Sequence, residues 1–295
     1  LLWSFKMGKK MIALLTLLII AISAEAGRIY IPKDENVIHH INNINKTEGL
    51  NPKEINVLVW NIYKGEMKSW KNEFFRLSQQ KELLLIQESI RHTRVRDELE
   101  RMPWMEFIFA TSWYNIKYLN SETGVMTGST SQALSQKWQR SYYLEPILHT
   151  PKLTLFTKYK IQGHESTLLV ANIHGINIVK AYKLRHMLDQ AAEEIKKHHG
   201  PVIFAGDFNT WTKTKINNMR SVLKRLGLKA VSFKNDIRKA FRGNPLDHAW
   251  VRGLDVLESD VPNSSGSDHM PMTMKLRFNE SDSLTSKLLT KSFQI

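Results

Sequence analysis

Short runs of apolar residues that end in a polar or ionisable side chain constrain most strongly how this chain can fold. The clearest runs cover residues 55–60, 83–86, 168–171 and 202–205. Runs this short suit strands better than helices, because a helix usually needs ten or more residues. Their nearly continuous apolar character is typical of strands that are buried on both faces. The chain is therefore predicted to contain central strands covered on both sides.

Further strands and helices are predicted from the spacing of the remaining apolar residues. The other expected strands cover residues 106–110, 123–127, 153–156, 249–251 and 272–278. Helices are expected at residues 68–80, 179–198 and 217–226. The second helix meets Gly200-Pro201 and the third meets Gly227, which are common helix stops. Because strands and helices intermix without an internal repeat, we predict one layered α/β domain over residues 54–279.

The first 26 residues have the layout of a secretory signal peptide. Lys9 and Lys10 precede an apolar run at residues 11–22, and Ala24-Glu25-Ala26 supplies a small-x-small cleavage site. This layout predicts a periplasmic or secreted protein. The alternative is an uncleaved N-terminal helix that anchors the protein in a membrane.

Two other terminal segments are predicted to lie outside the domain. Residues 27–53 are polar, Asn-rich and weakly periodic, and we expect a linker or an arm that lies on the domain. Residues 280–295 are rich in Ser, Thr and Lys, which predicts a frayed tail.

Composition limits the chemistry that the chain can perform. It has no cysteine, which excludes disulfides, thiolate zinc sites and cysteine nucleophiles. Any metal must be held by oxygen or imidazole ligands, which suits Mg²⁺ or Mn²⁺. The formal net charge of +14 favours a polyanionic partner, such as nucleic acid, phosphorylated lipid head groups or acidic polysaccharide. A basic protein can also simply be soluble, so charge alone does not decide the partner.

Polar side chains of hydrolytic types follow the predicted strands. Loops at strand ends often carry functional side chains, because a rigid base presents them. The residues in these positions are Asn61, Glu88, Asn172, His174, Asp207 and Asn209, with Asp268 and His269 before the last strand.

Six short segments occur in an order that resembles the endonuclease/exonuclease/phosphatase superfamily, over residues 55–278. They are Trp60-Asn61, Ile86-Gln87-Glu88-Ser89, Asn172-Ile173-His174, Gly206-Asp207-Phe208-Asn209, Leu246-Asp247-His248 and Ser267-Asp268-His269-Met270-Pro271. The fourth and the last are specific when they occur together. Segments 59–64, 121–126 and 245–247 are most similar to the YafD-like bacterial branch, which transfers little about substrate. The resemblance implies a DNase I-like four-layer α/β sandwich, in which helices flank two packed β-sheets.

The resemblance also implies a metal-dependent hydrolysis of phosphoesters. Glu88, with Asn61 beside it, is the first-choice ligand of Mg²⁺ or Mn²⁺, and Asp268 is a further metal-side carboxylate. His269 is expected to be the general base, because an imidazole titrates near neutral pH. Asp247 is expected to orient that imidazole.

Three further residues complete the expected site. Asp207 would hold the nucleophilic water or a metal, and Asn209 would donate to the phosphoryl oxygens. His174 would protonate the leaving oxygen or stabilise its charge. DNase I-like proteins give this histidine a carboxylate partner, and Glu122 is the candidate nearest the right segment. Each residue alone has an ordinary structural explanation, but the set in family order favours catalysis.

Substrate-binding candidates rest on weaker patterns. Arg91, followed by Arg94 and Arg96, would bind phosphate or form a solvated helix face. Trp211 and Lys213, with Lys215 nearby, would grip a nucleic-acid strand or anchor the surface. The adjacent pairs His39-His40 and His198-His199 are not expected to bind a metal, because neighbours in sequence face different directions.

Three functions from different classes follow. The first is a nuclease with little sequence specificity that acts on DNA, which the basic charge supports. The second is a phospholipid or inositol phosphodiesterase or phosphatase. A lipid-cleaving enzyme would need an exposed apolar hairpin, which is not obvious in the sequence, and a head-group phosphatase would need a pocket of lysines and arginines. The third is a non-catalytic phosphate-binding module, which is disfavoured because no motif residue is missing. No obligate protein partner is evident.

Overall fold

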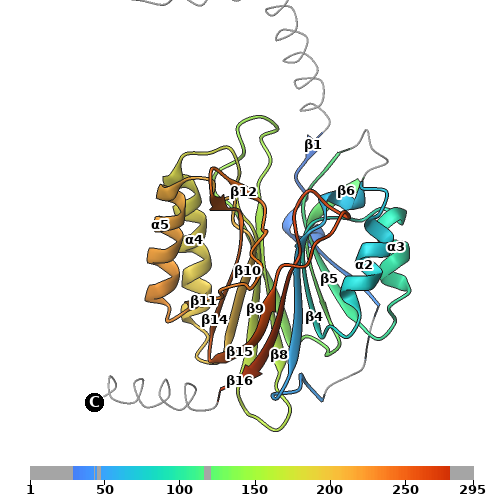
Figure 1. Ribbon diagram of the computed structural model, residues 1–295. Helices are drawn as coiled ribbons and strands as arrows, with labels where there is room; N and C mark the ends of the chain where they lie inside the picture. Colours follow the sequence, from blue (N-terminus) through green and yellow to red (C-terminus); the bar gives the residue numbers. More distant parts are fainter. Residues whose placement is uncertain (1–28, 43, 45–47, 116–120, 280–295) are drawn as a thin grey trace, which may run out of the picture.

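Two β-sheets packed face to face form the centre of the computed structural model, and helices cover both outer faces (Figure 1). The structure describes residues 29–42, 44, 48–115 and 121–279. The predicted signal segment and tail lie outside these residues. The four-layer α/β sandwich expected from the sequence is confirmed.

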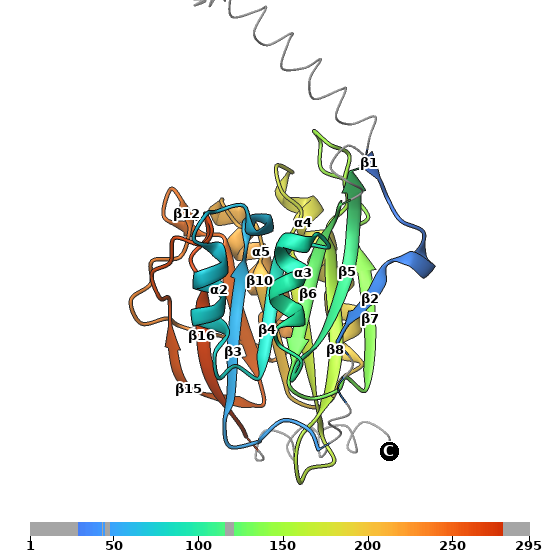
Figure 2. The same ribbon diagram turned by 90° about the vertical axis from the view of Figure 1, so that its right-hand side faces the viewer.

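The first sheet has the strand order β1-β5-β6-β4-β3-β16-β15, and β2 also pairs with β5. Its strands are β1 (Ile29–Tyr30), β2 (Ile38–Ile41), β3 (Ile55–Asn61), β4 (Leu83–Ile90), β5 (Glu106–Asn115), β6 (Ser121–Ser129), β15 (Leu254–Asp260) and β16 (Met272–Phe278). Figure 2 shows its outer face, which is covered by α2 (Trp70–Ser78) and α3 (Thr93–Glu100).

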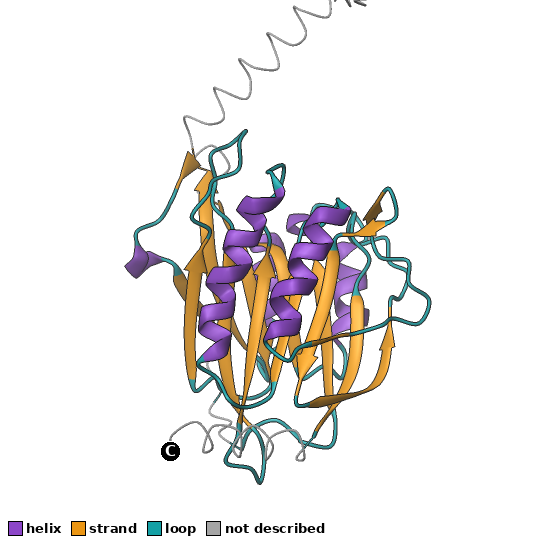
Figure 3. Cartoon of the chain, turned by 90° about the vertical axis from the view of Figure 1, so that its left-hand side faces the viewer, coloured by secondary structure: helices purple, strands orange, loops and turns teal. Residues whose placement is uncertain are grey.

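The second sheet has the order β11-β14-β10-β9-β8-β7. Its strands are β7 (Ser135–Arg140), β8 (Leu153–Lys160), β9 (Thr167–His174), β10 (Val202–Asp207), β11 (Lys229–Ala230) and β14 (Asp247–Arg252). Figure 3 shows α4 (Ala181–Lys196) and α5 (Lys213–Arg225) lying across it. Short elements fill the loops: η1 (Asp34–Asn36), η2 (Tyr63–Gly65) and the hairpin of β12 (Ala240–Phe241) and β13 (Asn244–Pro245).

Side chains of the central strands alternate between two hydrophobic layers, which explains their continuous apolar runs. On β3, Val57 and Val59 face the other sheet, whereas Leu58 and Trp60 pack against the helices. The strands β4, β9 and β10 alternate in the same way. A side-chain period of two with apolar cover on both faces produces such a strand.

The parallel pairs β3–β4 and β9–β10 end at the same edge of the sandwich. The strands β8 and β14 run antiparallel to their neighbours and therefore begin at this edge. We call it the site edge. It is the upper end of the molecule in Figure 1, where β1 and β12 are labelled.

Several elements were not predicted from the sequence. The missed helix α3 is short and highly charged, and only a few of its residues are buried. The missed strand β7 lies at a sheet edge and has the polar sequence SQKWQR. The expected linker or arm at residues 27–53 contains β2, which pairs with β5, and a fully buried Val37. Tertiary pairing, and not local propensity, makes these segments regular.

Among the described residues, no helix is both long and apolar enough to cross a membrane.

The stability of the fold is expected to fall in mild acid because of His198. This half-buried imidazole lies 2.9 Å from the carbonyl oxygen of Thr167 and 3.1 Å from that of Pro201. Burial, aided by Lys158, lowers its pKa to about 4. The unfolded chain therefore binds more protons between about pH 6.5 and pH 4, and stability is lost as the pH falls through that window.

Urea unfolding at about pH 7 and about pH 5 measures this loss, which is at most about 1.4 kcal/mol per pH unit. His198→Gln keeps an N–H donor but does not titrate, so its loss of stability should be smaller. Equal losses in the two proteins would contradict the assignment.

Candidate active site

The alternation of the central strands brings four predicted site residues together. Asn61 continues the inward series of β3, and His174 continues that of β9. Asp207 and Asp247 pair across β10 and β14 at the ends of their inward series. The two parallel pairs end at the site edge, so all four side chains point into the space between the sheets there.

The Glu88 side chain also points into the space between the sheets, but strand alternation does not explain its direction. The inward residues of β4 are Leu83 and Leu85, so regular alternation would turn Glu88 toward the helices. A register shift between Ile86 and Ser89 interrupts the pairing of β4 with β6, and Glu88 adopts a φ of 48°. A bulge of this kind re-aims a side chain, and left-handed backbone in a non-glycine residue is typical of functional sites.

A buried carboxylate–imidazole pair lies at the centre of the site. Nδ1 of His269 is 2.8 Å from Oδ2 of Asp247, and both residues are buried. The carboxylate accepts the Nδ1 proton and leaves Nε2 facing Asp207, 3.9 Å from its Oδ2. The orienting role predicted for Asp247 agrees with this geometry.

Asn61 holds two carboxylates together. Its side-chain N–H groups donate to Oδ2 of Asp207 at 3.1 Å and to Oε1 of Glu88 at 3.3 Å. Its side-chain oxygen accepts the backbone N–H of Tyr63 at 3.1 Å. In this orientation Asn61 presents donors, and not its oxygen, to the space where a cation would bind.

Asn209 positions Asp207. Its backbone N–H donates to Oδ1 of Asp207 at 2.9 Å, and its side-chain amide donates to the carbonyl oxygen of Gly175 at 2.9 Å. One amide N–H is therefore engaged within the protein and not aimed at a phosphoryl oxygen, the role expected from the sequence. The residue joins the loops that follow β9 and β10.

His174 lies beside Asp207 and Glu88, with Nε2 at 3.6 Å and 4.0 Å from their carboxylate oxygens. Burial is the largest cause of a pKa well below the usual value for His174, and the nearby Lys152 and His269 lower it further. The imidazole is thus neutral at pH 7. A neutral imidazole can donate an N–H hydrogen bond to a developing negative charge. It does not carry the extra proton that general-acid catalysis by an imidazolium would transfer.

Asp207 and His269 both have raised pKa values. Burial and the adjacent Asp247 raise the pKa of Asp207. Burial lowers the pKa of His269, but the Asp247 and Asp207 carboxylates outweigh it and raise the value to about 9. Like charges buried this close need a counter-charge.

Comparison with known proteins identifies the family that carries this arrangement. The family model described as "Endonuclease/Exonuclease/phosphatase family" matches residues 58–269, which includes every residue of the buried group. The chain belongs to the endonuclease/exonuclease/phosphatase family. Its relatives include UPF0294 proteins of Vibrio campbellii, 34% identical over 77% of this chain and 79% of the relative, and Erwinia tasmaniensis, 32% identical over 78% and 84%.

Solved structures of the endonuclease/exonuclease/phosphatase family share the fold. A family protein from Bacteroides thetaiotaomicron superposes with a TM-score of 0.60 at 14% identity, covering 77% of this chain and 99% of that one. The human Nocturnin catalytic domain with bound sulfate gives 0.60 at 16%, covering 82% and 97%. A mannosyl-6-phosphatase of Bacteroides thetaiotaomicron gives 0.58 at 15%, covering 76% and 100%. The predicted superfamily and its YafD-like branch are confirmed.

The donor set of this family member fits a hard divalent cation. Asp207, Asp247 and His269 each offer a ligand atom within 4.8 Å of the others, and all three are buried. Asn61 ties the carboxylate of Glu88 to the same group. Carboxylate oxygens are the ligands that Mg²⁺ and Mn²⁺ prefer. A bound cation would also offset the clustered negative charge that raises the pKa values of Asp207 and His269.

Asp268 lies outside the group that the structure brings together. Its carboxylate is exposed and forms an ion pair with Lys239. The role expected for Asp268 is that of a further metal-side or hydrogen-bonding carboxylate. In the structure successive loop residues point in opposite directions, so His269 faces inward and Asp268 outward. Among the described residues, the buried carboxylates that could hold a cation are Asp207 and Asp247, with Glu88 beside them.

Glu122 is not the carboxylate partner of His174. It accepts hydrogen bonds from Thr111 at 2.6 Å and Arg91 at 2.7 Å. Although burial opposes the change, His39, Thr111 and Arg91 lower its pKa to about 2. Arg91 is thereby occupied within the first sheet. Arg94 donates to the carbonyl oxygen of Gly65 in η2, and Arg96 donates to Glu100 on α3. The three arginines do not form a joint phosphate site.

The other substrate-binding candidates lie close to the site but differ in exposure. Lys213 is exposed at the start of α5, and Trp211 is half-buried against Phe241. Lys215 is buried, with Nζ 3.3 Å from the carbonyl oxygen of Asn209 and 4.9 Å from the Trp211 ring. Burial lowers its pKa to about 8. Lys215 therefore supports the loop after β10 from within.

Ser267 and Trp60 occur in the six family-like segments, but the sequence predicts no role for them. The Ser267 hydroxyl donates to the carbonyl oxygen of Asn61 at 2.6 Å and accepts the backbone N–H of His269 at 3.2 Å. The Trp60 indole donates to the carbonyl oxygen of His269 at 2.8 Å. Both residues fix the loop that carries His269. Their positions within the quoted motifs were the only available signal.

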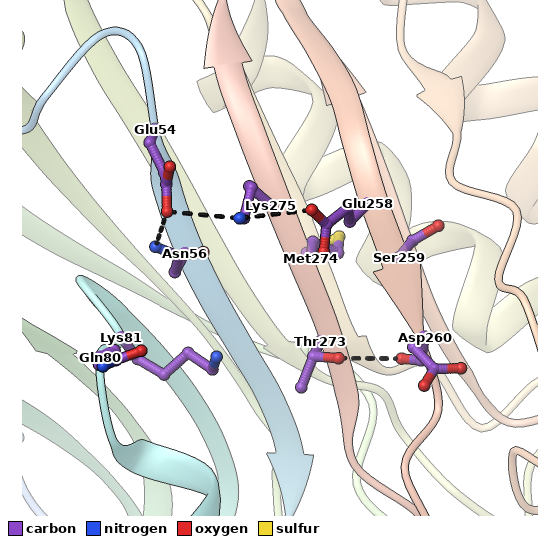
Figure 4. A pocket seen from close by; sticks show the side chains of 10 residues that line it. All are labelled: Glu54, Asn56, Gln80, Lys81, Glu258, Ser259, Asp260, Thr273, Met274 and Lys275. Carbon is purple, nitrogen blue, oxygen red and sulfur yellow. Dashed lines mark hydrogen bonds and ion pairs between the residues drawn. The ribbon is translucent and has the colours of Figure 1, made fainter.

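A second polar pocket, of about 260 Å³, lies on the outer face of the first sheet (Figure 4). Lys275 pairs there with Glu258 at 3.3 Å and with Glu54 at 3.6 Å. Its three carboxylates, of Glu54, Glu258 and Asp260, face two lysines, Lys81 and Lys275, and no imidazole lines it. It lacks the donor set of the site between the sheets.

Proposed function

We propose that this chain is a divalent-metal-dependent phosphodiester hydrolase whose active site is the buried group around Asp207 and His269. The observation that carries this proposal is the convergence of Asp207, Asp247 and His269 within 4.8 Å, with Glu88 and His174 beside them. The family match supports it, because the family name describes enzymes that cleave phosphoesters.

The residues divide the chemistry between them. Asp207, Asp247 and Glu88 would hold a cation, which would neutralise charge on the phosphoryl group when bound. Asp247 keeps the Nδ1 proton of His269 in place, so Nε2 is the atom that takes a proton from the attacking water. Water oxygen bonds to phosphorus, and the bond to the leaving oxygen breaks. His174 donates its N–H toward that oxygen and stabilises its charge.

Two substrate classes fit this chemistry. Nucleic acid, with DNA first, is one class, and the net charge of +14 supports it. Phospholipid head groups are the second class, and the charge supports them equally, because each carries a phosphodiester. Exposed apolar side chains at the site edge favour the second class.

The proposal predicts hydrolysis of bis(4-nitrophenyl) phosphate, a soluble phosphodiester, that stops with EDTA and returns with Mg²⁺ or Mn²⁺. Asp207→Ala should reduce this activity by about 10³-fold or more, because it removes a buried metal-side carboxylate. Asp34→Ala, at an exposed residue of η1, is the matched control. Supercoiled plasmid and phospholipid vesicles, tested in parallel, separate the two substrate classes.

Calorimetric titration with Mn²⁺ gives a readout that does not depend on the substrate. The full-length wild type should bind Mn²⁺, and Asp207→Ala should not. Metal-independent hydrolysis, or equal Mn²⁺ binding by both proteins, would overturn the proposed role of the site.

A further inference from the structure

The site edge carries a set of exposed apolar side chains that the buried site does not use. We call this set the apolar rim. Its members are between 37% and 73% exposed, and they are Tyr142, Leu144, Ile147, Ile178, Tyr182 and Phe241. Exposed apolar side chains that gather at one edge of a soluble domain indicate an interaction site.

The rim borders the active site on two sides. The loop at residues 141–152 precedes β8, whose Thr154 pairs with Ile173 next to His174. Oε1 of Glu145 in that loop accepts the backbone N–H of Asn177 at 2.9 Å, which joins it to the loop after β9. On the other side, Phe241 packs edge-on against Trp211, two residues after Asn209.

Packing within the rim keeps its side chains at the surface. The ring of Tyr143 contacts Tyr142 at 5.1 Å and Tyr182 at 5.7 Å, both edge-on. Lys183 lies 5.0 Å above the same ring. Tyr143 thus forms a half-buried base from which more exposed side chains project. Tyrosine with its apolar body and polar tip suits the boundary between water and lipid.

Positive charge accompanies the rim. Lys180, Lys213 and Arg242 are exposed beside it, on the loop before α4, at the start of α5 and in the β12–β13 hairpin. Apolar side chains surrounded by basic ones form the pattern by which peripheral proteins bind an anionic bilayer.

The described chain also begins at this edge. Ile29 of β1 pairs with Asn115 at the end of β5, which runs in the same direction as β3, and Figure 1 shows β1 at the end of the molecule that carries β12. The apolar run at residues 11–22 precedes Ile29 by the six residues 23–28. Six residues span at most about 20 Å. Whenever that run lies in a membrane, the site edge is held near the same surface.

From these observations we propose that the apolar rim docks the site edge onto an anionic phospholipid bilayer, so that the active site meets lipid head-group phosphodiesters. The substrate part of this proposal rests on the function proposed above, and the docking part does not. The sequence shows no obvious apolar hairpin, because the rim is assembled from three loops that are distant in the chain.

Nucleic acid fits the rim less well. A nucleic-acid surface combines cations with aromatic rings, on which bases stack. Leu144, Ile147 and Ile178 neither stack on bases nor bind phosphate, whereas each gains free energy when it enters the acyl boundary of a bilayer. The aliphatic side chains of the rim therefore favour a lipid surface over nucleic acid.

Amide hydrogen exchange of the full chain tests docking without requiring turnover. Vesicles of phosphatidylglycerol and phosphatidylcholine in equal parts should slow exchange at residues 142–148 and 177–182, and pure phosphatidylcholine vesicles should slow it less. Unchanged exchange at both loops would overturn the docking proposal, even if the soluble phosphodiester is hydrolysed. Protection without any hydrolysis would leave docking in place and refute the proposed function.

A rim variant tests the consequence for activity. The triple change Tyr142→Ser, Ile147→Ser and Tyr182→Ser removes three rim side chains. Its matched control, Phe75→Ser, Trp104→Ser and Leu134→Ser, removes three comparably exposed side chains outside the rim. The rim variant should hydrolyse phosphatidylglycerol in vesicles about tenfold or more slowly, while both variants should retain wild-type turnover of bis(4-nitrophenyl) phosphate.

Two outcomes would overturn this part. The control triple change could slow vesicle hydrolysis as much as the rim change, which would remove any special role for the rim. The rim change could instead slow plasmid nicking and leave vesicle hydrolysis intact, which would assign the rim to nucleic acid.

Discussion

His269→Gln is expected to lower kcat for bis(4-nitrophenyl) phosphate by about 10³-fold or more, since it removes the group that accepts the proton of the attacking water. Glutamine preserves volume and a hydrogen-bonding end but does not titrate. The Asp247 carboxylate, 2.8 Å from Nδ1, would then face an amide. Circular dichroism and the unfolding midpoint establish that the variant remains folded.

Asp247→Asn distinguishes proton transfer from mere packing at the same place. The amide is nearly isosteric, but it removes the negative charge that holds the Nδ1 proton of His269. A wrong tautomer presents a proton instead of a lone pair to the water, and a large loss of kcat should follow. His40→Gln, on β2 and away from the group, should retain wild-type activity.

A loss below about tenfold in His269→Gln would remove His269 from proton transfer.

Gly206→Ala should destabilise the fold by about 3 kcal/mol or more. A Cβ on Gly206 would lie 2.0 Å from the carbonyl oxygen of Ile173 on β9 and 3.1 Å from the amide nitrogen of Gln87. Its φ of 144° is also one that an L side chain rarely adopts. The parallel pair β9–β10 would have to separate where it positions His174 and Asp207.

Gly163→Ala is the control that separates the steric clash from backbone strain. Its φ is 73°, but a Cβ there would meet nothing within 4 Å. It should cost about 1 kcal/mol, the usual penalty for leaving a glycine conformation. Guanidinium unfolding measures both changes. Equal costs for the two variants would show that β9 and β10 tolerate the added group.

Strand ends at the site could be predicted from the sequence because both faces of each central strand are buried. Burial on both faces requires a continuous apolar run, as at residues 83–86 and 202–205. The polar residue that follows each run marks the end of the strand. The edge strands and α3 could not be predicted in this way. At most one face of each of these elements is buried, so many different local sequences can form them.

Residue roles were harder to predict than residue positions. Asp268 and His269 are neighbours with hydrolytic side chains, and only the path of the loop sends one outward to Lys239 and the other inward to Asp247. Glu122 is near the expected segment in sequence, yet it pairs with Arg91 on another part of the first sheet. Such choices depend on side-chain direction in three dimensions.

By itself, the sequence determined the layered α/β class, the family, and the polar residues that end the buried strands, because each leaves a local pattern of apolarity or a short motif. Tertiary structure alone decided which of those residues share one buried space, how the bulge turns Glu88 inward, and how three separate loops assemble the apolar rim. Those outcomes depend on strand register and loop direction, and residues distant in the chain set both together.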